Sequence, residues 1–211
     1  MFKTNGEQPG DPAERGHGRR MAVEGSAIRS QFVDAAEAVL AEHGAGALSA
    51  GKVAAQAGLK PQLLYYYFRT MDDLVLAVVE RVNDRRLTRF VDALTSPEPL
   101  RALWEQMADP GSARLAAQLT TIANDRPSIS AGIVSSARQF RALQTEAVRR
   151  LLPPGSPSAE GIVMIAASLA RTMVNESALG LTEGHAEARA IVEQVLGGLK
   201  VAGEPVRAEA R

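Results

Sequence analysis

The sequence predicts an all-α protein of about nine helices, in which a small N-terminal helical domain precedes a larger one. From residue 26 onward, apolar residues recur every three to four positions, the spacing of one helix face. Ala, Leu and Val dominate while aromatic residues are only 4% of the chain, which favours helix over sheet. No segment shows the strict alternation of apolar and polar residues that indicates a strand.

The composition excludes several classes of protein. The 211 residues contain 24 basic and 24 acidic side chains, so a uniformly basic surface is excluded but a local basic face is not. Without cysteine there can be no disulfide, thiolate metal site or cysteine nucleophile. No apolar run is long enough to span a membrane, and no secretory signal is visible at the N-terminus. We therefore expect a cytoplasmic protein that has no contact with a membrane.

Composition also predicts the boundaries of the domains. Residues 1–25 are rich in glycine and charge and poor in apolar side chains, so we expect a disordered tail. Residues 26–72 would form the small domain and 73–202 the larger one. Residues 203–211 would be a flexible tail.

Start and stop residues predict the four helices nearest the N-terminus. Ser26 is a suitable N-cap and Gly44 a suitable stop for the first helix. Ser49, Pro61 and Thr70 are suitable residues to begin the next three. These helices are expected at about residues 27–43, 50–57, 61–67 and 71–90.

Proline and glycine divide the rest of the chain into five further helices. Pro97 and Pro99 are the expected hinge between the fourth helix and this part of the chain. The helices are expected at about residues 99–108, 112–124, 127–152, 158–180 and 184–200. The last two carry wide apolar stripes that either complete the core or pair with a second copy of the chain. We expect a homodimer through residues 158–200, because a monomer rarely leaves such a patch open.

Residues 48–69 have the layout of a helix-turn-helix, with two short helices flanking a turn that contains Gly58. Lys52, Lys60 and Arg69 give this stretch a charge of +3, and it contains no acidic residue. A local basic face in a neutral protein is suited to binding nucleic-acid phosphates.

Other chemical signals in the sequence are weak. Residues 46–52 match the GxxxxGK phosphate loop, but Val53 replaces the Ser or Thr that would hold Mg²⁺, and no strand precedes the loop. The histidines at positions 17, 43 and 185 lack metal-ligand spacing. We find no catalytic motif. We therefore expect no enzyme activity, no metal and no cofactor.

The order and spacing of residues between Arg29 and Val82 resemble the N-terminal domain of TetR-type transcriptional repressors. The matching residues are Ala35-Ala36, Leu40, His43-Gly44, Leu48-Ser49, Val53-Ala54, Ala57-Gly58-Leu59, Leu64-Tyr65, Tyr67-Phe68, Asp73-Leu74 and Ala77-Val78. The resemblance implies a recognition helix over 61–67 that enters the major groove of double-stranded operator DNA.

By matching positions, the resemblance also implies which residues contact DNA. Gln62, Leu63 and Tyr66 are the expected readers of base edges, since Gln can pair with adenine and an apolar group can meet a thymine methyl. The expected contacts around them, mainly to phosphates, are Ser49, Lys52, Lys60, Pro61, Tyr67 and Thr70. Tyr65 and Phe68 are expected to pack inward.

The chain departs from the pattern of the family at three positions in this region. Lys60 replaces a helix-capping Ser or Thr, Gly51 replaces a frequent basic residue, and Met71 replaces a Lys that touches phosphate. These departures bear on the affinity for the operator more than on the fold.

For the larger domain the resemblance implies a pocket for a small, largely apolar effector. Its expected wall residues are Trp104, Met107, Leu119, Phe140, Met164 and Met173. Arg171 and Asn175 would either orient the effector or pair across the dimer interface. The implied function is a ligand-responsive repressor, and the alternative is a helical ligand-binding dimer that has lost specific DNA binding.

Overall fold

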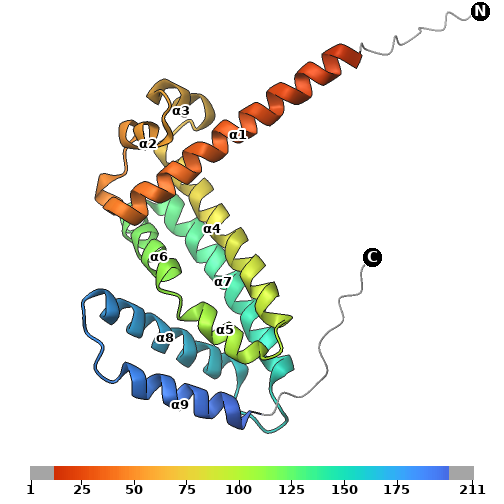
Figure 1. The fold of residues 1–211 in the computed structure, drawn as a ribbon, viewed down its shortest axis with the longest axis vertical. Helices are drawn as coiled ribbons and strands as arrows, with labels where there is room; N and C mark the ends of the chain where they lie inside the picture. The colour runs from red at the N-terminus through yellow and green to blue at the C-terminus, as the bar shows by residue number, and fades with distance from the viewer. Residues whose placement is uncertain (1–11, 200–211) are drawn as a thin grey trace, which may run out of the picture.

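The computed structural model describes residues 12–199, and these form nine α-helices and one short 3-10 helix (Figure 1). The elements are α1 Pro12–His43, η1 Ala45–Ala47, α2 Ala50–Ala57, α3 Pro61–Tyr67, α4 Met71–Leu94, α5 Pro99–Met107, α6 Pro110–Ala123, α7 Pro127–Leu151, α8 Ala159–Ala178 and α9 His185–Gly198. The all-α architecture predicted from the sequence is therefore confirmed.

The first helix is much longer than the sequence predicts. It begins at Pro12, so the structure has residues 12–25, which were expected to form part of a disordered tail, as the first turns of α1. Proline suits the first turn of a helix, because an N–H there would have no helical partner. Extending an existing helix costs far less than nucleating a new one, so a stable segment after Ser26 can carry the preceding turns. Residues 1–11 and 200–211, which include the rest of both predicted tails, lie outside the described residues.

Most other boundaries lie within a few residues of the predicted ones, because the expected caps form. The Ser49 side chain accepts a hydrogen bond from the Lys52 N–H at 3.4 Å. Thr70 and Asp73 form a reciprocal capping box at the start of α4, with distances of 3.1 Å and 3.0 Å. Gly58 ends α2 with φ of 67°, a conformation that favours glycine. The 3-10 helix η1 was not predicted.

The small domain packs α1, α2 and α3 against the first turns of α4. The central side chains are almost fully buried and include Phe32, Leu40, Val53, Leu64 and Leu74. Residues from α6 and α7, such as Leu119 and Ile129, belong to the same core. The small domain is therefore joined to the larger one by a continuous apolar core, not by a flexible linker.

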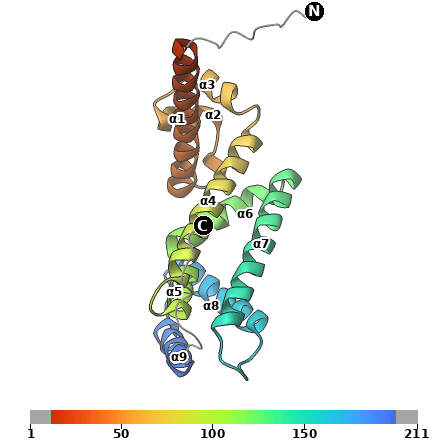
Figure 2. The same ribbon diagram turned by 90° about the vertical axis from the view of Figure 1, so that its right-hand side faces the viewer.

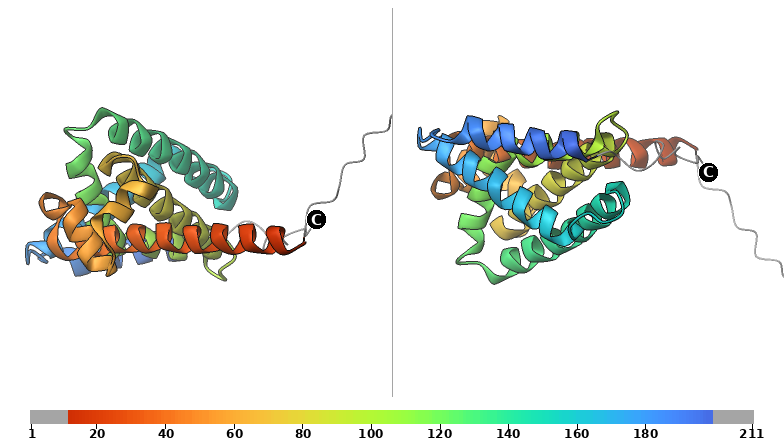
Figure 3. Two further views of the ribbon diagram at one scale, coloured as in Figure 1. Left: turned by 90° about the horizontal axis from the view of Figure 1, so that it is seen from above. Right: turned by 90° about the horizontal axis from the view of Figure 1, so that it is seen from below.

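In the larger domain, α4 and α7 run side by side away from the small domain (Figures 1 and 2). They approach closely at Gly132, where an added Cβ atom would lie 3.1 Å from a methyl of Leu76. Helices α8 and α9 lie at the end opposite α2 and α3 and are open to view from below (Figure 3). None of the helices that the structure describes is long and apolar enough to cross a lipid bilayer.

Candidate functional site

Helix α3 presents one exposed face formed by Pro61, Gln62, Tyr65 and Tyr66. Tyr66 is 79% exposed and Tyr65 is 53% exposed, which is unusual for large aromatic side chains. At 100° per residue these four positions cover an arc of about 140°, opposite the buried Leu64. We call this surface the exposed face of α3.

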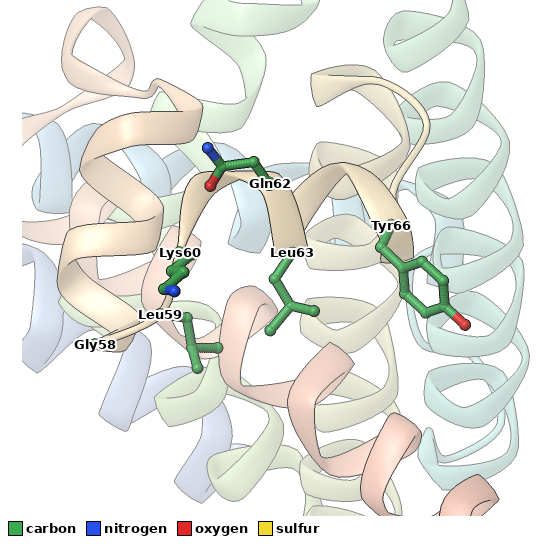
Figure 4. Close-up of a pocket in the computed structure, with 6 residues that line it drawn as sticks. All are labelled: Gly58, Leu59, Lys60, Gln62, Leu63 and Tyr66. Atoms are coloured by element: carbon green, nitrogen blue, oxygen red, sulfur yellow. The ribbon is translucent and has the colours of Figure 1, made fainter.

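A shallow hollow of about 530 Å³ adjoins this face at the turn between α2 and α3 (Figure 4). In the close-up, Leu59 and Leu63 point to the same side of the turn, whereas Gln62 points to the other. Leu63 is half-buried against the core of the small domain. Of the three residues expected to read base edges, Gln62 and Tyr66 are thus exposed, whereas Leu63 is only partly exposed.

The three consecutive tyrosines of α3 do not all point in the expected directions. Tyr65 was expected to pack inward, but it lies on the exposed face, because its position is about 100° around the helix from buried Leu64. Tyr67 turns back toward α1, where its ring centre is 6.5 Å from that of Phe32. It also meets the Tyr66 ring edge-on at 5.0 Å. Phe68 is buried, as expected.

Positive charge surrounds the exposed face of α3. Lys52, Lys60 and Arg69 are all exposed, and none forms an ion pair among the described residues. A fourth cation comes from α1, where the exposed Arg29 guanidinium stacks 5.0 Å from the centre of the Phe68 ring. Sequence reasoning missed Arg29, because only the packing of α1 against α3 brings it to this surface.

The helix ends near this face are arranged for contact with anions. The N-terminus of α2 carries the Ser49 cap, and α4 begins at the exposed Thr70. The nearby carboxylate of Asp72 is neutralised by Arg126 at 2.6 Å, so it opposes a phosphate less than a free carboxylate would. Lys60 makes no side-chain cap to α3, as its departure from a capping Ser or Thr predicts.

The structure does not bring the expected effector-binding residues into one cavity. Trp104, Met107 and Met173 pack together between α5, α8 and α9. Phe140 belongs to a second cluster, between α4, α5, α7 and α8. Leu119 belongs to the core shared with the small domain.

The remaining three expected effector residues lie on the surface. Met164, Arg171 and Asn175 are exposed on α8. For Arg171 and Asn175, exposure favours the alternative role of pairing across an interface.

Comparison with known proteins agrees with this geometry. Residues 32–78 match the family model described as "Bacterial regulatory proteins, tetR family". A transcriptional regulator from Rhodococcus sp. Rha1 has a similar structure, with a TM-score of 0.65 and 22% identity, over 83% of this chain and 99% of that one. A TetR transcription regulator from Haloarcula marismortui matches with a TM-score of 0.67 and 17% identity, over 82% of this chain and 98% of that one.

A third structure is a putative transcriptional regulator from Saccharomonospora viridis in complex with choline. Its TM-score is 0.66 at 16% identity, over 82% of this chain and 95% of that one. No curated protein sequence matches the chain.

The fold and the exposed face of α3 define the architecture as a helix-turn-helix domain followed by a helical second domain. The family match covers residues 32–78, and the fold of the described residues is similar to that of solved TetR-type transcriptional regulators. The resemblance seen in the sequence is thereby confirmed.

Proposed function

We propose that the protein is a repressor that binds operator DNA as a homodimer and is released by a small, largely apolar effector. The observation that carries this proposal is the exposed face of α3, where Gln62, Tyr65 and Tyr66 stand free of the core. Aromatic side chains are costly to leave in water, and here they lie among unpaired cations. Duplex DNA would supply partners for both kinds of group, because base edges can contact the aromatic side chains and phosphates can contact the cations.

Dimer formation is supported by the surface of α8 and α9. Apolar side chains on both helices are exposed, among them Ile165 at 70% and Ile191 at 61%. Exposed Val195 extends the apolar surface of α9. A two-fold axis through it would present two copies of α3 to successive turns of the DNA. Such a regulator acts on the chromosome, which fits the expected cytoplasmic location.

Release by an effector requires that the two domains move together. Three arginines of α4 hold it to α1 and α6: Arg81 bonds Asp34, Arg85 bonds Glu37, and Arg89 bonds Asp109. From α6, the Gln118 side chain accepts the Ala45 N–H at 2.7 Å, directly after α1. An effector that shifts α4 or α6 would therefore shift the small domain, provided that it binds one conformation better than the other. The choline complex of the Saccharomonospora viridis regulator supports a ligand site in this fold.

The alternative function, a ligand-binding dimer without specific DNA binding, rests on Gly51 and Met71. Neither residue supplies the positive charge that a family member often places there, and the space beyond Gly51 is open. The alternative predicts no saturable operator complex.

The deciding experiment is an anisotropy titration of the protein against the DNA that flanks its own gene. It is run at low and physiological salt, with Tyr66→Ala as the variant. We expect saturable binding that weakens steeply with salt and falls in the variant. If this DNA fails, selection from random sequence follows, and failure to enrich any sequence would favour the alternative.

A further inference from the structure

Arg86 stands apart from the other arginines of α4. Arg81, Arg85 and Arg89 each form an ion pair with a carboxylate. The Arg86 guanidinium instead lies over the face of Phe140 on α7, with 3.5 Å between its central carbon and the ring centre. Within residues 25–199 it has no ion pair and no hydrogen bond from its guanidinium. Its positive charge is thus held against an aromatic ring in the larger domain without a matching anion.

A second unmatched cation lies next to it. Arg141 follows Phe140 in α7, and its contact in the described structure is to the thioether of Met164, 3.6 Å away on α8. A thioether is a weak acceptor and carries no charge. Burial first, and then the positive charges of Arg141 and Arg89, lower the pKa of Arg86 to about 10. Arg86 therefore stays protonated at neutral pH, although its surroundings disfavour the charge.

Buried polar groups lie on the adjoining core. Gln144, one turn beyond Phe140 on α7, is a polar residue with only 4% of its surface exposed. Gln106 on α5 donates a hydrogen bond to the carbonyl oxygen of Arg86 at 2.9 Å, yet its own side-chain oxygen is buried without a partner. A buried polar atom without a partner is costly, so the Gln106 oxygen, on a side chain bonded to Arg86, points to a ligand.

The surroundings of this group are apolar. The Phe90 and Phe140 rings meet edge-to-face at 5.3 Å, and Leu103 and Val163 pack in the same cluster. Apolar side chains of this kind suit contact with a hydrocarbon body, whereas a guanidinium pair suits a planar carboxylate that it can hold with paired hydrogen bonds.

We propose that Arg86 and Arg141 bind the acidic head group of the effector, which is therefore a carboxylic acid with an apolar body. This inference rests on the proposed function, because it assumes that the larger domain holds the effector. Gln144 and Gln106 would complete the polar contacts. Phe140 and Met164, expected from the sequence as pocket residues, would contact the body near the head group.

The test measures binding to the full chain without DNA. The probes are octanoate and benzoate, each paired with its neutral amide, and the readouts are calorimetric affinity and melting temperature. The variants are Arg86→Met, Arg141→Met and Arg86→Lys. The control is Arg138→Met, because Arg138 is an exposed arginine of α7. We expect at least one acid to bind, its amide not to bind, and Arg86→Met and Arg141→Met to lose about tenfold or more in affinity. Arg86→Lys should fall between Arg86→Met and the wild type.

Three results would overturn the proposal: an amide that binds as well as its acid, an Arg86→Met protein with unchanged affinity, or no binding by either acid at millimolar concentration. The ligand-free proteins give a second measurement. If Arg86 serves a ligand, Arg86→Met should melt no lower than the wild type, because an unmatched charge has been removed, whereas a lower melting temperature would assign Arg86 a structural role. Since no DNA is present, failure of operator binding leaves both results unaffected.

Discussion

Asp72 and Arg126 form an ion pair at 2.6 Å that joins the first turn of α4 to the residue before α7. The Ser128 hydroxyl donates a further hydrogen bond to Asp72 at 3.3 Å. Thr70, an expected phosphate contact, lies two residues before Asp72. The pair therefore connects the DNA-facing end of α4 directly to the larger domain, and it also masks a negative charge near the expected path of the DNA.

Replacing Arg126 with alanine should weaken DNA binding more than it lowers stability. Both side chains are partly exposed, so the free energy of unfolding should fall by about 1 kcal/mol or less. Affinity for the operator should fall several-fold, because Asp72 would then repel phosphates and α4 would be held less firmly. Anisotropy titration and urea unfolding measure the two effects, with Arg138→Ala as the matched control on α7. Unchanged affinity in Arg126→Ala would exclude this role for the pair.

Neighbouring tyrosines should respond differently to truncation. Tyr65→Ala should leave the melting temperature nearly unchanged and reduce operator affinity about tenfold, the value of a good base or groove contact. Tyr67→Ala should lower the melting temperature, because it removes a ring packed against α1 near Phe32. Thermal unfolding and DNA titration of both variants separate the roles. The assignment is wrong if Tyr65→Ala unfolds early and Tyr67→Ala does not.

This contrast illustrates how far the sequence predicts the site. Helix caps are local, so the starts at Ser49, Pro61 and Thr70 could be predicted from residue type and spacing. The orientation of Tyr65 depends on which side of α3 meets the core, which three adjacent tyrosines do not reveal. Arg29 lies far from α3 in the sequence and reaches it only through tertiary packing.

The larger domain was harder to predict for the same reason. Its helices follow from proline positions and apolar spacing, but a pocket depends on which faces of several helices meet. Apolar type alone selected Trp104, Leu119 and Phe140, which the structure places in three different clusters. Nothing in the spacing of Arg86 distinguishes it from a solvated arginine, because its lack of a carboxylate partner appears only in three dimensions.

Restoring a positive charge at Gly51 should strengthen DNA binding. The position is exposed in the first turn of α2, and an added Cβ atom would meet nothing within 4 Å. Gly51→Lys should add one phosphate contact, so the slope of log affinity against log salt should steepen by about 0.9. Gly51→Ala controls for the change in helix propensity and should leave the slope unchanged. Equal slopes for Gly51→Lys and wild type would mean that DNA does not pass this end of α2.

Asp109 should make the protein sensitive to acid. It caps α6 by accepting hydrogen bonds from the Ser112 hydroxyl at 2.5 Å and the Ser112 N–H at 3.1 Å, and it pairs with Arg89. These interactions, the Ser112 hydroxyl first, lower the pKa of Asp109 below its usual value.

A carboxylate with a lowered folded pKa stabilises the protein fully above its unfolded pKa of about 4, and this stabilisation is lost as the pH falls through the folded pKa. Asp109→Asn keeps a capping residue but removes the titration. We expect the variant to lose less stability than the wild type between about pH 5 and pH 3, as measured by urea unfolding. Parallel curves over this range would show that Asp109 contributes nothing to acid sensitivity.

The exposed surface of α8 and α9 should hold two copies of the chain together. Ile165→Glu places a charge on this apolar surface at a position that is 70% exposed, and burying an unpaired carboxylate in an interface is strongly unfavourable. We expect sedimentation equilibrium to show a dimer for the wild type and a monomer for the variant, with the helical circular dichroism retained. Leu87→Glu, at a partly exposed apolar position on α4, is the control and should remain dimeric.

Operator affinity of Ile165→Glu should fall along with dimer formation, because a monomer offers one copy of α3 to a two-fold site. A wild-type chain that sediments as a monomer would contradict the dimer, whereas a dimeric Ile165→Glu protein would move the interface to another face.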